Sequence, residues 1–327
     1  MKSISILVPE SAVMEAIADP RYMFTAANQF LQASGEPELF DVKLVGTKKE
    51  IRQHGNAFSV HTDLLISQVK HTDLIIIPAL FGDMKSAVEQ NFETIKWLQD
   101  QQAKGAEIAS LCVGAFLLAS TGLLDGKKCS THWAFANEFR ETFPNVDLVD
   151  GSIITEENGL YSSGGANSYW NLLLYLLEKY TNRDIAILAS KYFAIDIDRE
   201  SQAAFMMFQG QKDHNDPEIK KVQDYIEQHF KEKISVDELA DMVAISRRSF
   251  ERRFKKATNN TAIEYAQRVK IEAAKRSFES TRRNINEVMF DVGYTDTKAF
   301  RTVFKKITGL TPIEYRNKYN KVTLESA

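Results

Sequence analysis

Cysteine is scarce in this chain of 327 residues, which contains only Cys112 and Cys129. Two cysteines cannot build the disulfide framework that holds small secreted domains together. The longest apolar runs, Leu74–Phe81 and Leu111–Ala119, fall well short of the roughly 18 residues that a membrane-spanning helix needs. The first apolar run, Ile4–Pro9, is too short for a secretory signal and is followed at once by an acidic residue. The sequence therefore predicts a cytoplasmic protein without a membrane partner.

Low-complexity stretches rich in proline, glycine or serine are also missing, so the composition does not indicate disorder. At roughly 150 residues per domain, the length suggests about two domains. The net charge of −3 hides an asymmetry, because residues 218–327 carry 13 lysines and 10 arginines against 16 acidic residues, a net charge of +7. Residues 1–217 carry −10. A basic module joined to an acidic one indicates that the C-terminal part meets a polyanion, although chance segregation of surface charge gives the same numbers.

Residues 1–208 alternate short apolar runs with stretches of helical periodicity. The Asn158-Gly159 pair marks a turn between two extended pieces. This alternation predicts an α/β domain, flavodoxin-like, with a mostly parallel sheet and helices on both faces. Residues 209–217 are polar, contain glycine and proline, and are the predicted linker. The predicted strands are 3–8, 40–45, 74–77 and 107–111, and the predicted helices are 11–34, 86–104, 166–180 and 184–208.

Residues 218–320 contain only short amphipathic helices, which predicts a separate all-α domain. Two closely spaced helix pairs resemble each other at a separation of about fifty residues, which indicates an internal duplication. The predicted helices are 218–230, 236–243, 247–256, 262–278, 285–292 and 296–306.

Each helix pair has the pattern of a helix-turn-helix unit. In the first pair, Ala244 marks the turn and Ser246 can cap the second helix. Phe250 and Phe254 lie four residues apart and face inward, which leaves a basic outer face. The outer residues are Arg248, Glu251 and Arg252.

The second pair repeats the pattern, with Gly293 at the turn, Thr295 as the predicted cap, and Phe300 and Phe304 facing inward. An ordinary helical hairpin explains either pair taken alone. Two pairs in tandem within a positively charged segment favour DNA binding. The outer residues of the second pair are Thr297, Lys298, Arg301 and Thr302.

Residues 218–320 resemble the AraC-type DNA-binding domain, most closely over the stretch 291–316 (DVGYTD…FRTVFKKITGLTPIEYR). The resemblance implies two recognition helices that enter successive segments of the major groove of promoter DNA. It also implies base contacts from the outer residues of both pairs, and arginine and glutamate can read guanine and cytosine. Two residues depart from the family pattern, Met289 in a place for a small residue and Thr302 in a place for arginine. The predicted phosphate contacts are Arg253, Lys255, Lys256, Lys305 and Lys306.

Cys112 stands where a predicted strand runs into a predicted helix, with small Gly114 and Ala115 behind it. A sharp turn that exposes a nucleophile needs small neighbours. A thiol at a helix N-terminus is also shifted toward the thiolate. The alternative is an ordinary buried cysteine.

The stretch from Cys112 through TGLLDG and Thr131-His132-Trp133 to 161–165 (YSSGG) resembles the class I glutamine amidotransferase-like, PfpI-type domain that is fused to AraC-type regulators. The resemblance covers about residues 1–208 and places Glu15 beside the cysteine. Two departures argue against hydrolysis: Val113 stands where proteolytic members have histidine, and 78–82 reads PALFG in place of Pro-Gly-Gly. A structural role in a hydrogen-bonded loop is the alternative for His132.

The sequence as a whole predicts a DNA-binding transcription regulator that is a homodimer and responds to a small molecule, a nitrogen-containing metabolite by resemblance. No catalytic residue, cofactor or metal is predicted, since histidine and cysteine show no metal-ligand spacing. The alternative is a cysteine-dependent hydrolase or hydratase that carries a DNA-binding autoregulatory domain. The predicted ligand-pocket residues are Cys112, Val113, Glu15, His132 and Gly82.

Overall fold

The computed structural model describes residues 1–53, 55–197, 201–208, 210–212 and 214–320. It divides into two compact units, Met1–Gln202 and Ala203–Ala327. The division falls before residues 203–208, which the sequence analysis assigned to the first domain. Phe208 is partly buried and packs against the core of the second unit, with its ring 5.0 Å from that of Tyr265. Among the described residues, no helix has the length and apolarity needed to cross a bilayer.

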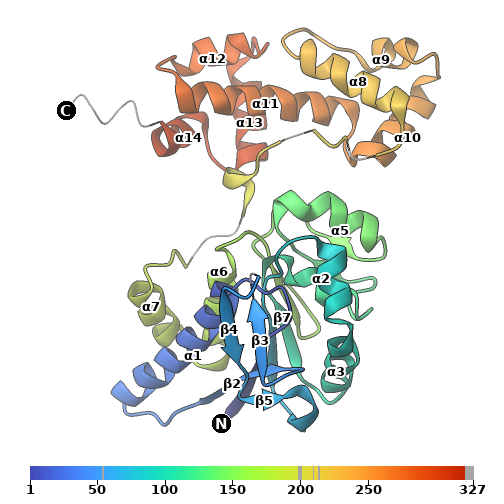
Figure 1. The fold of residues 1–327 in the computed structure, drawn as a ribbon. Helices are drawn as coiled ribbons and strands as arrows, with labels where there is room; N and C mark the ends of the chain where they lie inside the picture. The colour runs from blue at the N-terminus through green and yellow to red at the C-terminus, as the bar shows by residue number, and fades with distance from the viewer. Residues whose placement is uncertain (54, 198–200, 209, 213, 321–327) are drawn as a thin grey trace. The chain divides into compact units, whose positions relative to one another are not determined.

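The first unit is built on a seven-stranded sheet in the order β10-β11-β7-β6-β1-β2-β5 (Figure 1). All neighbouring strands are parallel except β10 and β11, which form an antiparallel hairpin across the predicted Asn158-Gly159 turn. Strand β6 (LIII) is buried along its whole length, as expected for a strand covered on both faces. The strands are β1 Lys2–Leu7, β2 Phe40–Gly46, β5 Leu64–Leu65, β6 Leu74–Ile77, β7 Glu107–Ser110, β10 Ile154–Glu157 and β11 Leu160–Ser163.

Helices cover both faces of this sheet, which confirms the predicted fold class (Figure 1). Helices α1, α6 and α7 pack against one another on one face, and α2, α3 and α5 lie on the other. A hairpin, β3 Glu50–Gln53 with β4 Phe58–His61, and a short parallel pair, β8 Lys128–Cys129 with β9 Asp147–Leu148, lie outside the main sheet. The helices are α1 Glu15–Ala33, α2 Met84–Gln90, α3 Phe92–Ala103, α4 Ala115–Ala119, α5 Ala136–Thr142, α6 Tyr169–Tyr180 and α7 Arg183–Tyr192.

Two predicted helices of this unit are wrong in extent. The helix predicted over 86–104 is broken at Asn91, whose buried side chain donates to the carbonyls of Ala87 (2.7 Å) and Glu10 (2.9 Å). The helix predicted over 184–208 ends at Tyr192. Two residues later, Ala194 takes a left-handed conformation (φ +54°), which terminates the helix. Neither break has a glycine or proline to signal it.

The second unit is all helical, as predicted. Its hydrophobic side chains form two separate cores, one around Phe250, Phe254 and Tyr265 and one around Phe278 and Phe304. The central helix α11 has 19 residues, about 28 Å of length, and contributes to both cores. The helices are α8 Pro217–Gln228, α9 Val236–Met242, α10 Arg247–Thr258, α11 Ala262–Ser280, α12 Ile285–Asp291, α13 Thr297–Thr308 and α14 Pro312–Tyr319.

The predicted duplication is confirmed down to single hydrogen bonds. Helices α10 and α13 each have 12 residues and end in the same way, with the hydroxyls of Thr258 and Thr308 each donating at 2.8 Å to a carbonyl four residues earlier. The turns before them also agree, because Ala244 (φ +51°) and Gly293 (φ +76°) are both left-handed. The two halves of this unit are therefore the same supersecondary structure used twice.

Candidate nucleic-acid interface and candidate ligand site

The two matching helices α10 and α13 begin at well-formed caps. Ser246 accepts a hydrogen bond from the Ser249 amide, as predicted. The cap of α13 is Asp296, which accepts from the Ala299 amide at 2.6 Å, so the prediction of Thr295 is wrong by one residue. A carboxylate suits this position because its charge also opposes the helix dipole.

The outer faces of α10 and α13 carry the residues that the sequence predicted. Arg248, Glu251 and Arg252 on the first helix are exposed, as are Lys298, Arg301 and Thr302 on the second, while Thr297 is half-buried. The exposed lysines Lys255, Lys256, Lys305 and Lys306 lie in the last turn of each helix. Their charge interacts favourably with the negative end of the helix dipole, which stabilises the helix, and it is also presented to solvent.

Arg253 differs from the other predicted phosphate contacts. Its guanidinium donates two hydrogen bonds to the carboxylate of Asp216, at 2.9 Å from Nε and 2.6 Å from Nη2. The hydrogen bonds from Arg253 hold the pKa of Asp216 below its usual value. Fifty residues later the same helical position is Val303, which packs against the second core. Arg253 is therefore on a side of the helix that serves packing within the unit.

Arg247 belongs to the outer face although the sequence analysis did not select it. Its guanidinium pairs with Asp237 of α9 at 3.1 Å and with Glu251 one turn along its own helix at 3.2 Å. More than half of the Arg247 side chain is exposed, so both ion pairs are weak. Glu251 is thus held near an arginine in the absence of DNA, and the i,i+4 spacing was the signal that could have shown it.

A hollow of about 530 Å³ runs along the outer face of α10. Four of its lining side chains are cationic and one is acidic, so the hollow attracts anions. It is lined by Val236, Arg247, Arg248, Glu251, Arg252, Lys255 and residues 261–263.

In the first unit, Cys112 follows the end of β7 in the sharp turn that the sequence predicted. Its backbone is left-handed, with φ +54°. Gly114 must be small, because a Cβ there would lie 2.5 Å from the carbonyl oxygen of Pro78 and 2.9 Å from that of Ile77. The turn is thus pressed against the end of the neighbouring strand β6.

The Cys112 thiol is buried, with only 5% of the residue exposed. Its amide donates to the hydroxyl of Ser163 and its carbonyl accepts from the hydroxyl of Thr131, both at 3.2 Å. Burial raises the pKa of the thiol to about 12 and outweighs the hydrogen bond from the Val113 amide. The predicted shift toward the thiolate is therefore wrong, because the loss of solvation exceeds what the short helix behind the cysteine supplies.

Glu15 is the first residue of α1 and is exposed, and its carboxylate has no hydrogen bond within the part of the chain that the structure describes. Its charge adds to burial in raising the pKa of Asp19, against the opposing hydrogen bond that the Tyr169 hydroxyl donates at 2.6 Å. The Tyr169 hydroxyl also lies within electrostatic range of Cys112. The hydrogen-bonded pair of Asp19 and Tyr169 therefore belongs to the electrostatic surroundings of this site, and nothing in the sequence pattern had singled it out.

His132 caps the short helical turn Trp133–Phe135. Its Nδ1 accepts a hydrogen bond from the Ala134 amide at 3.1 Å, so the neutral ring carries its proton on Nε2. Burial lowers the pKa of the ring, which keeps it neutral near pH 7. The alternative reading of His132, a hydrogen-bonded structural residue, describes this geometry.

Gly82 lies in the loop after β6, left-handed at φ +92° and facing open space. The preceding residues pair with the loop after β1 through a bridge between Leu80 and Ala12. A hollow of about 370 Å³ lies here, lined by Ser11, Ala12, Gly55 and Phe81. This loop and Cys112 both follow the carboxyl ends of parallel strands. The order of strands reverses here, because β2 lies on one side of β1 and β6 and β7 lie on the other, and open α/β sheets bind ligands at such a point.

Gln202, the last residue of the first unit, is buried against the loop that carries His132. Its Nε2 donates to the carbonyls of Thr131 (3.2 Å) and Ser152 (2.8 Å), and its Oε1 accepts from the Trp133 amide (3.3 Å). Gly164 makes room for it, since a Cβ there would lie 1.8 Å from Nε2. Sequence reasoning missed this residue, because an isolated glutamine carries no pattern.

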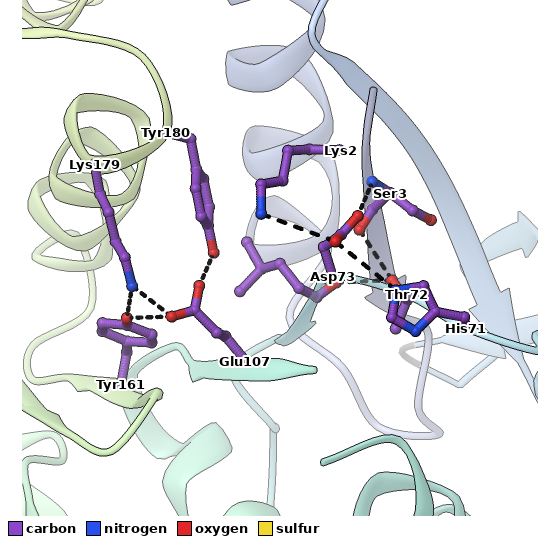
Figure 2. Close-up of polar contacts among 10 residues, drawn as sticks. Lys2, Ser3, His71, Thr72, Asp73, Glu107, Tyr161, Lys179 and Tyr180 are labelled. Atoms are coloured by element: carbon purple, nitrogen blue, oxygen red, sulfur yellow. Dashed lines mark hydrogen bonds and ion pairs between the residues drawn. The ribbon is translucent and has the colours of Figure 1, made fainter. Parts of the chain in front are cut away.

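A second polar cluster lies at the opposite end of β7 and is structural (Figure 2). The Glu107 carboxylate accepts hydrogen bonds from Tyr161, Tyr180 and Lys179. Burial opposes its ionisation, but these bonds outweigh burial and lower its pKa. Nearby, Asp73 accepts from the Ser3 amide and pairs with Lys2. These polar groups find their hydrogen-bond and ion-pair partners in one another, so the cluster serves to hold the fold together.

Comparisons with known proteins agree with both halves of this description. Residues 20–179 match the DJ-1/PfpI family, and residues 239–318 match a helix-turn-helix domain family. The chain joins a DJ-1/PfpI domain to an AraC-type DNA-binding domain. This confirms the resemblance and the fold class predicted from the sequence.

Among its relatives is the HTH-type transcriptional regulator GbdR of Pseudomonas aeruginosa, 27% identical over 245 residues. That alignment covers 75% of this chain and 66% of GbdR, so the chain spans just under two thirds of that relative. The regulator ArgR of the same species is 26% identical over 221 residues, 67% of each chain. A solved AraC family transcriptional regulator from Pseudomonas putida has the fold of the first unit, with a TM-score of 0.50, 17% identity, and coverage of 59% of this chain and 100% of that one.

Proposed function

We propose that this protein is a transcription regulator that acts in the cytoplasm as a homodimer, binds promoter DNA through its second unit and binds a small molecule in its first. The observation that carries the proposal is the repetition of one helix-turn-helix structure, each copy with exposed cations on its second helix. Relatives that align with 75% and 67% of the chain are HTH-type transcriptional regulators, which supports the same conclusion.

On DNA, the outer residues of α10 and α13 contact base edges. Arg248 and Arg252 suit guanine, and Glu251, once released from Arg247, suits cytosine. The residues of the second helix are Thr297, Lys298, Arg301 and Thr302. The lysines at 255, 256, 305 and 306 contact phosphates, which add affinity without sequence preference. Arg253 is left out of this set because Asp216 occupies its guanidinium.

The ligand site is the carboxyl edge of the parallel sheet in the first unit, where Cys112 and Val113 follow β7 and Gly82 follows the adjacent strand β6. His132 follows β8, outside the main sheet, and its neighbour Thr131 donates a hydrogen bond to the Cys112 carbonyl. Glu15 gives this edge an exposed carboxylate near the half-buried carboxyl of Asp19. A carboxylate pair favours a cationic group, which supports a nitrogen-containing metabolite as the effector.

The role of Cys112 in this proposal is to shape the pocket, not to react. A cysteine nucleophile must be a thiolate, and the pKa of about 12 keeps this one protonated at neutral pH. Within the part of the chain that the structure describes, the imidazole of the neighbouring loop is His132, and its Nδ1 caps a turn. The alternative, a cysteine-dependent hydrolase or hydratase, requires a ligand that opens the site and lowers this pKa.

The DNA-binding part of the proposal is tested by fluorescence anisotropy on duplexes from the gene's own upstream region. Wild type should bind one of these duplexes more tightly than its scrambled version, and Arg248→Ala with Arg252→Ala should remove the difference. Equal binding of wild type to all duplexes would contradict the assignment of base contacts.

The ligand part is tested by melting the full chain in a panel of amines, amino acids and uncharged metabolites. All three tryptophans lie in the first unit, so tryptophan fluorescence reports its melting alone. A ligand selective for the folded state raises that transition. A cationic compound should do so in wild type and not in Glu15→Gln, and turnover of such a compound that Cys112→Ser abolishes would favour the enzyme.

A further inference from the structure

The end of the predicted first domain and the predicted linker after it both lie along the second unit and make specific contacts with it. We call residues 203–208, 210–212 and 214–216 the strap. In its first half, the Met206 carbonyl accepts from Lys275 Nζ at 2.6 Å, and the Phe208 amide donates to Glu272 Oε2 at 3.1 Å. Each of these two backbone groups of the strap therefore binds the side chain of one residue of α11.

Lys275 and Glu272 form an ion pair of 2.8 Å whose side chains are only 5% and 12% exposed. A buried ion pair stabilises a fold only if its remaining donors and acceptors are satisfied. Here the strap supplies both missing partners with its own backbone. Removing the strap would leave two poorly satisfied charges on the central helix, so docking is favoured strongly over release.

The two ends of the strap contact different halves of the duplicated structure. At its start, the Phe205 ring lies 4.8 Å from Lys318 Nζ of α14, and Ala203 lies beside Gly309, the cap that ends α13. These contacts belong to the second helix-turn-helix half.

The other end of the strap contacts the first half. Gln211 accepts from Asn260 at 2.6 Å, and Lys212 pairs with Glu227 of α8 at 2.7 Å. Asp216 then holds Arg253 of α10 itself. The strap thus runs from the end of one predicted recognition helix to the side of the other.

We propose that the strap is a positioning element that fixes the relative placement of the two recognition helices, an inference that rests on the proposed binding of DNA. The two cores are separate, and α11 is the helix that contributes to both. Fixing the spacing of the two helices before binding lowers the conformational entropy that is lost on DNA. It also restricts binding to one spacing of the two half-sites, by which we mean the DNA segments that α10 and α13 of one chain contact. Asp216 and Arg253 are positioning residues in this scheme, and Arg253 acts without touching phosphate.

Hydrogen exchange on the full chain without DNA tests whether the strap is docked. The Phe208 amide and its neighbours should exchange much more slowly than an unstructured peptide of the same sequence, because the amide is bonded to a buried carboxylate. Exchange of these residues at the rate of the unstructured peptide overturns the proposal.

The positioning role is tested by Asp216→Asn in the full chain. Asparagine keeps the cap of α8 but loses the charge that holds Arg253. The matched control is Asp237→Asn, which removes a different partner of α10, the one paired with Arg247 and lying outside the strap. The probes are a duplex obtained by binding-site selection with wild type, and the same duplex with one base pair inserted between the two half-sites.

Wild type should discriminate against the inserted base pair. Asp216→Asn should bind the selected duplex about two- to fivefold more weakly, the range for a partly exposed ion pair, and discriminate less against the insertion. Arg253→Gln should lower the affinity and the discrimination to the same extent. The double variant should bind the selected duplex no more weakly than either single variant. Discrimination that stays at the wild-type level in Asp216→Asn, or is lost equally in Asp237→Asn, overturns the proposal.

The salt dependence separates this role of Arg253 from a phosphate contact. A residue that contacts phosphate lowers the slope of log affinity against log salt by about one when it is removed. Arg253→Gln should leave the slope unchanged, and a slope lowered by one overturns the positioning role. Failure of wild type to prefer any duplex would instead refute the proposed function itself, whatever the exchange experiment shows.

Discussion

Gly293 and Ala244 occupy equivalent turns of the duplicated structure, and exchanging the two residue types tests the packing of the second one. Both residues are left-handed, at φ +76° and +51°. They differ in their surroundings, because a Cβ at Gly293 would lie 2.1 Å from the carbonyl oxygen of Lys231 and 2.8 Å from its carbonyl carbon. The first turn accepts a methyl group, and the second has no room for one.

The free energies follow from these distances. A left-handed backbone costs a residue with a Cβ about 1 kcal/mol, and overpacking against rigid atoms costs about 1–3 kcal/mol. Gly293→Ala should therefore lower the stability of the second unit by about 2–4 kcal/mol, a large share of the ~5–15 kcal/mol typical of a domain. Ala244→Gly relieves the strain but gains freedom in the unfolded chain, so we expect a change within about 1 kcal/mol.

Urea unfolding of the full chain separates the two units. Far-ultraviolet circular dichroism follows helix loss in both, while Trp97, Trp133 and Trp170 report only on the first. Gly293→Ala should move the dichroism transition to lower urea, leave the tryptophan transition in place and weaken binding to DNA. If Gly293→Ala and Ala244→Gly have equal midpoints, the close approach of the Lys231 backbone does not limit this turn.

Other consequences can be measured directly. Arg252→Ala should cost about 1–3 kcal/mol on the selected duplex and relax its preference, whereas Lys306→Ala should weaken selected and scrambled duplexes alike in the same anisotropy assay. Affinity of the full chain should fall by orders of magnitude between about 50 and 200 mM salt, and a flat response would contradict a phosphate-bound mode. Cys112 should react slowly with iodoacetamide at pH 7 until urea unfolds the chain, because burial raises its pKa to about 12, and rapid labelling of the folded protein would contradict this. Glu107→Gln should destabilise the first unit at neutral pH by about 1–3 kcal/mol in tryptophan-monitored unfolding. Its difference from wild type should shrink as the pH falls below the ordinary carboxyl pKa, since the folded protein lowers that pKa and the charged form supplies the stability.

Much of the arrangement of the proposed DNA-binding helices followed from periodicity alone. The spacing of Phe250 and Phe254, repeated at Phe300 and Phe304, placed four rings in the cores and left the cationic residues outside. The parallel sheet followed in the same way from alternating apolar runs. Such patterns can be read because burial within a helix or strand repeats with the element's own geometry.

The tertiary structure decided what depends on partners distant in the chain. Whether Cys112 is a thiol or a thiolate depends on how many atoms surround it, and the strand-to-helix motif is compatible with either state. Arg253 looked like its cationic neighbours until Asp216, 37 residues earlier, was found to hold it. The polar stretch after residue 208 looked like a free linker, because its hydrogen bonds to Asn260 and Glu227 join segments that no local period connects. Local sequence determines which face of an element is apolar, but solvation and pairing of a polar group are set by whichever residues the fold brings against it.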